Sequence, residues 1–328
     1  MPSQNTMLLA DPQDDVELRN LAVVDPLDRT LSKDTIYTEE TVETSTGPVL
    51  VAFAGDRTKP ALLTYHDLGL NYVSNFQAFF NYPEMKEICQ SFCVFHVNAP
   101  GQEEGALLFP EECEFPTMEQ LGEQIQEVLN HFSLVRYIGI GVGLGANVLV
   151  RHALAYPERV DCLMLINTQT TKAGWMEWGY QKRNVSHLRT TGVTQPVLDY
   201  LLWHHLGQDY TERSHDLVNV YKHYFEKDVQ GINLAKLVEQ FIWRTDIPLD
   251  RLGATLEVPV LNLVGIYSPF IDDTVTFNGR LAPSKTNWIK IQEAAMVLEE
   301  QPGKVSEAFR LFLQGQGYCL KIRKIAVQ

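Results

Sequence analysis

Short apolar runs alternate with amphipathic stretches from residue 60 onward, and this alternation predicts a mostly parallel β-sheet with helices on both faces. The expected strands are Ala61–Tyr65, Cys93–Val97, Tyr137–Gly141, Cys162–Ile166, Val258–Val264 and Asn287–Ile291. The expected helices lie at about 83–90, 117–131, 145–156, 273–281 and 303–314. Thr117 followed by Gln120 is a capping-box pattern, which supports the start of the second helix. The fold class predicted from this pattern is α/β.

Three segments depart from the alternation. Residues 1–33 are acidic and lack hydrophobic periodicity, so we expect a flexible N-terminal arm. Two β-rich segments follow, around 35–43 and 48–54, and the turn signal between them predicts an antiparallel hairpin. Residues 316–328 carry Lys321, Arg323 and Lys324 without an acidic residue and are expected to form a short basic tail.

The longest interruption is residues 170–250, which contain no strong strand. An insertion of this length after the strand ending at Ile166 is expected to form a helical cap over a core made of residues 34–169 and 251–315. Trp175 and Trp178 stand three residues apart and are expected on one buried helix face.

Histidines are frequent in the predicted cap, where they would be the first candidates for a metal site. His204, His205, His215 and His223 include no pair with the H-x-x-x-H spacing of a helical metal site, and no cysteine joins them. We therefore expect neither a metal nor a cofactor. The five cysteines are an odd number with mostly apolar neighbours, which favours reduced thiols over disulfides.

Composition and charge narrow the class of partner. The chain is 45% hydrophobic and 21% charged, as expected for a soluble globular protein. Its formal net charge of -14 argues against nucleic acid as a partner. Apolar runs do not reach the roughly 18 residues of a membrane-spanning helix, so no transmembrane segment is expected. Met1–Ala10 lacks the features of a signal peptide, which makes the cytoplasm the expected location.

A glycine-rich turn follows the strand Tyr137–Gly141 and precedes a helix. As a dinucleotide-binding fingerprint it is only a partial match, because Leu144 or Ala146 stands where the third glycine belongs. The context also argues against it, since the next strand ends in Leu165-Ile166-Asn167 rather than in an acid. The nucleophile elbow G-x-S-x-G of α/β-hydrolases fits better, since Gly141 and Gly145 supply both flanking glycines. Gly143 then stands where the nucleophilic serine belongs.

The other two members of a catalytic triad can be sought in the order that this fold uses, acid and then histidine. The acid is expected near Ser268, while Asp272 and Asp273 are expected at the start of the following helix. The position of the histidine is occupied by Ala295, and no histidine follows His223. Hydrolysis by the standard triad is therefore excluded, and the chain is not expected to be an enzyme.

A vestigial pocket is expected around the turn after the first parallel strand, where a hydrolase supplies an oxyanion-hole amide. The candidate lining residues are His66, Asp67, Leu68, Gly143 and Leu144. Packing of His66 against local backbone is at least as plausible as a role in lining the pocket. A turn-stabilising role for Asp67 is favoured over a functional one.

The sequence resembles the N-myc downstream-regulated (NDRG) family. The matching stretches are Leu63–Gly69, Phe80–Tyr82, His96–Gln102, Ile138–Ala146, Leu165–Asn167, Gly174–Trp178 and Glu300–Lys304. This resemblance implies an α/β-hydrolase fold without hydrolase activity. It also implies a cytoplasmic protein that acts in signalling, differentiation, stress response or trafficking through protein partners whose identity the residues do not reveal.

Three hypotheses about function stay open at this point. The favoured one is a non-catalytic interaction protein that uses the vestigial pocket or the cap surface. A small-molecule or lipid binder using the vestigial pocket is the first alternative. A weak esterase with unconventional residues is the second, because residual rate can survive the loss of triad members.

Overall fold

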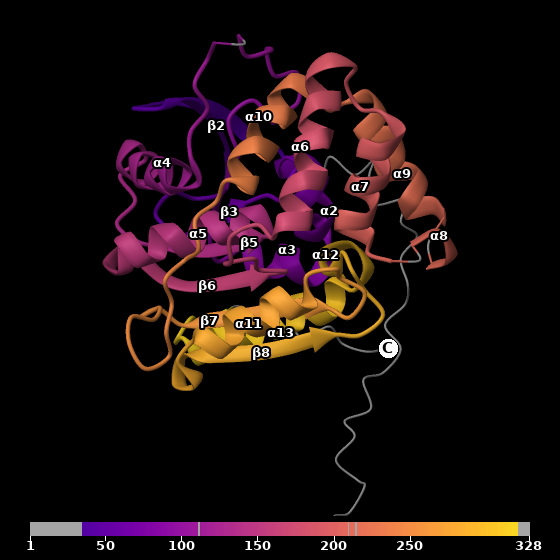
Figure 1. The fold of residues 1–328 in the computed structure, drawn as a ribbon. Coiled ribbons are helices and arrows are strands. Elements are labelled where there is room, and N and C mark those ends of the chain that lie inside the picture. Colours follow the sequence, from indigo (N-terminus) through magenta and orange to yellow (C-terminus); the bar gives the residue numbers. More distant parts are fainter. Residues whose placement is uncertain (1–34, 111, 209, 214, 321–328) are drawn as a thin grey trace, which may run out of the picture.

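One eight-stranded sheet organises the computed structural model, which describes residues 35–110, 112–208, 210–213 and 215–320 (Figure 1). The predicted arm 1–33 and residues 321–328 of the predicted tail lie outside the described residues. The strand order is β1-β2-β4-β3-β5-β6-β7-β8, with antiparallel pairing at β1–β2 and β2–β4 and parallel pairing elsewhere. The strands are β1 (Thr38–Thr44), β2 (Gly47–Ala54), β3 (Ala61–Tyr65), β4 (Cys93–Val97), β5 (Tyr137–Val142), β6 (Val160–Ile166), β7 (Val260–Gly265) and β8 (Thr286–Ile291).

These bounds confirm the predicted hairpin and the six predicted parallel strands, with small differences at the strand ends. Side chains alternate between two buried clusters along the central strands, because successive residues of a strand point to opposite faces. Leu63 belongs to one cluster and Leu62 to the other. Both faces of the sheet are therefore covered, as the continuous apolar runs predict.

Helices cover the two faces in separate layers. Buried side chains of α4, α5 and α11 pack in one cluster, and those of α2, α3, α12 and α13 pack in the other. Thr117 and Gln120 form the predicted capping box at the start of α4. The helices of the two layers are α2 (Ala78–Asn81), α3 (Pro83–Cys89), α4 (Met118–His131), α5 (Leu144–Ala155), α11 (Ile271–Arg280), α12 (Val297–Glu300) and α13 (Pro302–Gly315). Short turns of other helix types lie at η1 (Val73–Gln77), η2 (Pro157–Arg159) and η3 (Pro283–Lys285).

Glycines in β5 allow α5 to lie close to the sheet. Ile138, Ile140 and Val142 belong to the cluster on the opposite face, so Gly139 and Gly141 point toward α5. A Cβ atom on Gly141 would lie 2.7 Å from Ala146 Cα, and one on Gly145 would overlap the carbonyl oxygen of Tyr65. The glycine-rich turn is therefore built for close approach of strand and helix.

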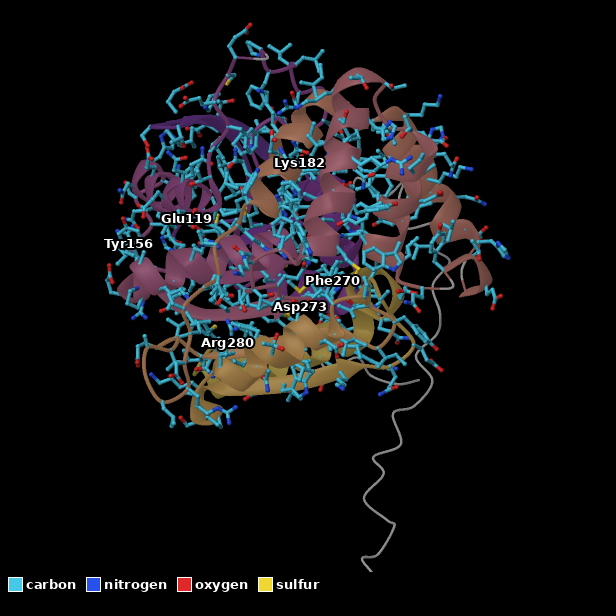
Figure 2. The ribbon with its side chains drawn as sticks, in the orientation of Figure 1. Glu119, Tyr156, Lys182, Phe270, Asp273 and Arg280 are labelled. Atoms are coloured by element: carbon cyan, nitrogen blue, oxygen red, sulfur yellow. The ribbon has the colours of Figure 1, made fainter. Side chains whose placement is uncertain are left out.

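Five helices between β6 and β7 form the region that we call the cap (Figure 1). They are α6 (Trp175–Thr190), α7 (Gln195–Leu206), α8 (Tyr210–Arg213), α9 (His215–Lys227) and α10 (Gly231–Ile242). The cap contacts the loops that follow the strands, since Asn233 Nδ2 of α10 donates hydrogen bonds to Gly101 O and Leu107 O. Phe270, just before α11, packs its ring on Trp203 and His204 of α7, and lies between cap and core in Figure 2.

The predicted burial of Trp175 is wrong. Its side chain is 86% exposed, whereas the ring of Trp178 packs against Trp243 with 5.6 Å between centroids. The buried residues of α6 begin at Gln181, and Trp175 is the first residue of the helix, beyond the part that packs.

The described residues contain no helix with the length and hydropathy needed to span a bilayer. All five cysteines are free, and Cys113 and Cys319 are exposed. The described cysteines therefore agree with the expected reduced state.

Substituting Gly141→Ala is expected to lower the free energy of unfolding by about 1–3 kcal/mol, because the added methyl group must push α5 away from β5. The matched control is Gly279→Ala in α11, where a Cβ meets no atom within 4 Å. That change should be neutral or stabilise by up to about 1 kcal/mol. Urea denaturation of both variants measures the difference, and equal effects would contradict the close approach.

Candidate functional site

The loops after neighbouring parallel strands meet at one edge of the sheet. Tyr65 at the end of β3 pairs with Gly141 of β5, so Asp67 and Gly143 follow their strands at the same offset. Gly143 precedes α5 with φ 50° and ψ -108°, and its N–H donates to Ile166 O at 2.9 Å. This is the position and the strained backbone of a nucleophile elbow, but the residue carries no side chain that can attack.

The carboxylate of Asp67 occupies the space that a nucleophile would need. Its Oδ1 accepts hydrogen bonds from Leu68 N at 2.7 Å and from Leu144 N at 2.8 Å. Hydrolases of this fold use the equivalent pair of amides, one after the nucleophile and one after the third strand, as their oxyanion hole. A Cβ atom on Gly143 would overlap the Asp67 carboxylate. Asp67 therefore accepts from both of the corresponding amides in this chain and leaves no room for a side chain at position 143.

The second carboxylate oxygen of Asp67 faces the cap. Asp67 Oδ2 lies 3.0 Å from His204 Nε2 and 3.7 Å from His205 Nδ1, both on α7. The backbone N–H of Asp67 donates to Asn75 Oδ1 at 2.8 Å, which fixes the loop from the other side. All three residues of this Asp67–His204–His205 cluster are buried. The cluster joins core to cap beside Gly143.

Electrostatics in this cluster favour an ionised aspartate beside a neutral histidine. Burial by itself would raise the pKa of Asp67, but His204, His205 and the Leu144 N–H stabilise the carboxylate and lower its pKa to about 2. Burial lowers the pKa of His205 to about 4. At neutral pH, Asp67 carries a negative charge and His205 is uncharged.

Both histidines are oriented by a second contact. His205 Nε2 donates to Leu68 O at 2.9 Å, because a carbonyl oxygen can only accept. His204 Nδ1 lies 3.1 Å from Tyr200 Oη. The candidate ligand atoms of Asp67, His204 and His205 lie within 4.8 Å of one another. These are the residues that could hold a metal ion, and the sequence did not indicate them because Asp67 lies 137 positions from His204.

His66 performs a local structural role. Its Nδ1 donates to Asp67 O at 2.8 Å, and its Nε2 accepts from Ala99 N at 2.8 Å. Burial lowers its pKa to about 4, so the ring is neutral at physiological pH. His66 therefore joins the loop after β3 to the loop after β4, which is the packing against local backbone that the sequence allowed.

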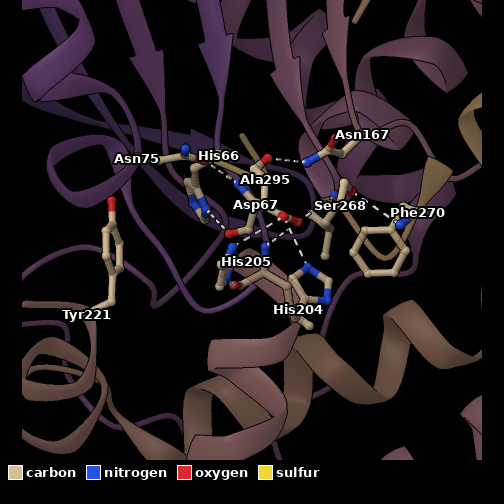
Figure 3. Close-up of polar contacts among 12 residues, drawn as sticks. His66, Asp67, Asn75, Asn167, His204, His205, Tyr221, Ser268, Phe270 and Ala295 are labelled. Carbon is tan, nitrogen blue, oxygen red and sulfur yellow. Dashed lines mark hydrogen bonds and ion pairs between the residues drawn. The ribbon is translucent and has the colours of Figure 1, made fainter. Parts of the chain in front are cut away.

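Ser268 and Ala295, the positions predicted for the acid and the base, carry neither a carboxylate nor an imidazole. Ser268 follows β7, and its Oγ accepts from Phe270 N at 3.2 Å. Ala295 follows β8, and its N–H and that of Met296 donate to Glu300 Oε2 at 2.6 and 2.8 Å. Figure 3 shows both positions on the loops around Asp67. Asp272 and Asp273 stand in the first turn of α11, as predicted from the sequence.

A small cavity of about 20 Å³ lies beside the cluster, which is room for roughly one water molecule. Asp67 is the one predicted pocket residue among its lining residues. Three of the other predicted residues form hydrogen bonds with Asp67 instead. Leu68 and Leu144 donate their backbone N–H groups to its carboxylate, and His66 donates to its backbone carbonyl. The cavity lining also includes Asn75, Val142, Asn167, His205 and Met296.

Comparison with known proteins gives a consistent family match. Residues 39–320 match the Ndr family. Protein NDRG3 of Xenopus laevis is 39% identical over 291 residues, which cover 85% of this chain and 76% of that protein. Protein NDRG1 of Xenopus tropicalis is 36% identical over 296 residues, which cover 88% of this chain and 73% of that protein.

Solved structures of hydrolases share the fold. A thermophilic esterase from Thermogutta terrifontis superposes with a TM-score of 0.68 at 20% identity, covering 86% of this chain and 100% of that chain. The enol-lactonase from Burkholderia xenovorans LB400 gives a TM-score of 0.66 at 17% identity, covering 84% and 100% respectively. These likenesses confirm the predicted α/β-hydrolase fold.

Substituting Asp67→Ala is expected to destabilise the protein by about 2–5 kcal/mol, because two buried amides, Leu68 N–H and Leu144 N–H, lose their acceptor. Asp67→Asn keeps an acceptor oxygen of the same size and should cost clearly less. Urea denaturation at neutral pH measures both losses. Equal destabilisation by the two variants would show that the amides do not depend on this acceptor.

Proposed function

The chain belongs to the Ndr family, and we propose that it is a non-enzymatic α/β-hydrolase-like protein that acts through protein interactions. We further propose that it acts in signalling, differentiation, stress response or trafficking, in the cytoplasm. The observation that carries the proposal is the Asp67 carboxylate, which takes both amides of the oxyanion hole.

Acyl transfer needs an oxyanion hole that is free to stabilise developing negative charge. Here the two amides already bind a carboxylate oxygen, and Asp67 stays ionised because its pKa is about 2. A substrate carbonyl would have to displace this charge from a buried site. Gly143 provides no nucleophile, and Ala295 provides no base. Acyl transfer is thus disfavoured by the occupied oxyanion hole as well as by the missing nucleophile and base.

The close packing of the cap on Asp67 also supports a non-enzymatic function. His204 and His205 are buried against Asp67, and the neighbouring cavity measures about 20 Å³. Pockets for organic ligands are typically about 300–1,000 Å³. A small-molecule or lipid ligand in the vestigial pocket, or a weak esterase activity there, would therefore require the cap to move. These alternatives have less support than partner binding.

Exposed apolar side chains on the cap favour a protein partner. Trp175 is 86% exposed and Met176 is 88% exposed, at the start of α6. Large apolar groups that face solvent, especially tryptophan and methionine, are enriched at protein interfaces. The first turn of α6 is the surface that we assign to partner binding.

We expect no labelling of the protein by a fluorophosphonate serine-hydrolase probe and no turnover of an ester panel. A catalytically intact hydrolase of the same fold is the positive control. Ser268→Ala tests the buried serine that lies in the former acid position. Labelling or turnover that disappears in Ser268→Ala, or on a change near Gly143, would contradict the non-enzymatic proposal.

Replacing Trp175 and Met176 by serine is expected to remove specific partners while leaving the fold intact, because both side chains face solvent. Quantitative affinity purification would compare this variant with the unmodified chain. Leu252→Ser is the matched control, since Leu252 is 95% exposed and lies outside the cap. Identical partner sets for all three proteins would exclude the first turn of α6 as the interaction surface.

A further inference from the structure

We propose that Asp67, His204 and His205 bind a divalent transition-metal ion of the Zn²⁺ class, and that this ion joins the cap to the core. The site does not depend on the proposed partner binding, and neither proposal fails with the other. It differs from the expectation drawn from the sequence, because the three ligands come from the loop after β3 and from α7.

The spacing of the donor atoms suits a small metal ion. Asp67 Oδ2 lies 3.0 Å from His204 Nε2 and 3.7 Å from His205 Nδ1. In a tetrahedral zinc site, bonds of about 2.0–2.2 Å place neighbouring ligand atoms about 3.3 Å apart. The two observed distances lie on either side of that value. At present the N–H of His204 Nε2 donates to Asp67 Oδ2. Release of this proton to solvent and small shifts of the side chains would bring the three atoms around one ion.

His205 directs its second ring nitrogen toward Asp67. Its Nε2 carries a proton, because it donates to Leu68 O at 2.9 Å. Its Nδ1 lies 3.7 Å from Asp67 Oδ2, which is longer than a hydrogen bond. A metal ion bound to both atoms would fill this gap.

Each of the three ligands is held by an outer contact, as is usual in metal sites. His205 donates to a backbone carbonyl, and His204 Nδ1 lies 3.1 Å from Tyr200 Oη. The other oxygen of Asp67 accepts from Leu68 N and Leu144 N, which fixes the carboxylate. The ligand atoms are thus oriented before any ion binds.

A separate observation, the small cavity beside the cluster, suits a fourth ligand. The cavity of about 20 Å³ is lined by Asp67, His205 and Asn167. Asn167 is 6% exposed, and its Oδ1 accepts no hydrogen bond from the described residues. A buried acceptor of this kind normally has a donor. Water bound to the metal ion would occupy the cavity and donate to Asn167.

The chemistry of the three proposed ligands indicates which class of ion the site would bind. Two imidazoles and one carboxylate suit Zn²⁺ and similar ions, whereas Mg²⁺ and Ca²⁺ prefer oxygen ligands alone. The exposed thiols of Cys113 and Cys319 are competing zinc ligands and must be removed from any test.

The test uses the full chain without an affinity tag, carrying Cys113→Ser and Cys319→Ser and stripped of metal with a chelator. Calorimetric titration is expected to show about one bound Zn²⁺ per chain, and the melting temperature should rise with zinc concentration. Mg²⁺ at the same concentrations should neither bind stoichiometrically nor raise the melting temperature. A chain that binds no Zn²⁺ stoichiometrically overturns the proposal.

Single substitutions test whether the ion binds at the three proposed ligands. His205→Gln should weaken Zn²⁺ binding at least about tenfold and abolish the zinc-dependent rise in melting temperature. His223→Gln, on the exposed surface of α9, is the matched control and should bind like the parent protein. If His205→Gln does not fold, Asp67→Asn serves in its place. Visible absorption of bound Co²⁺ gives a second readout, expected in the parent and lost in the ligand variant. Unchanged zinc binding in the ligand variant would overturn the assignment.

Discussion

The backbone amides of Leu68 and Leu144 lie in a buried site and need an acceptor, and the Asp67 carboxylate accepts from both. A buried donor without an acceptor costs about 1–3 kcal/mol, so this interaction constrains everything around it. It requires the loops after β3 and β5 to meet, which the pairing of Tyr65 with Gly141 ensures. It also requires position 143 to lack a side chain. The feature that excludes a nucleophile is therefore part of what stabilises the core.

Because this carboxylate is buried, the stability of the core depends on contacts with the cap. An ionised aspartate away from water needs a compensating partner, and α7 provides His204 and His205. The same carboxylate leaves no room for a side chain at position 143. The contact between cap and core and the need for glycine at position 143 thus depend on one residue. Trp175, at the start of α6 in the cap, lies outside these buried contacts and is exposed to solvent.

Most of the fold was predictable because the relevant signals are local. Apolar runs predicted the parallel strands, and the Thr117–Gln120 pair predicted a helix start that the structure confirms. Trp175 was misplaced because a spacing of three residues predicts a shared helix face but not where packing along the helix begins. Helix periodicity contains no information about a neighbouring element.

By itself, the sequence determined the strands, the glycine elbow and the absence of a serine and a histidine at their expected positions. These properties depend on residue type and on short spacings. Only the tertiary structure decided which side chains lie beside Gly143. Asp67 was expected to stabilise a turn, and His204 and His205 lacked a metal-site spacing. Their meeting joins residues 137 positions apart through the docking of α7 on the sheet edge, and no local pattern encodes that contact.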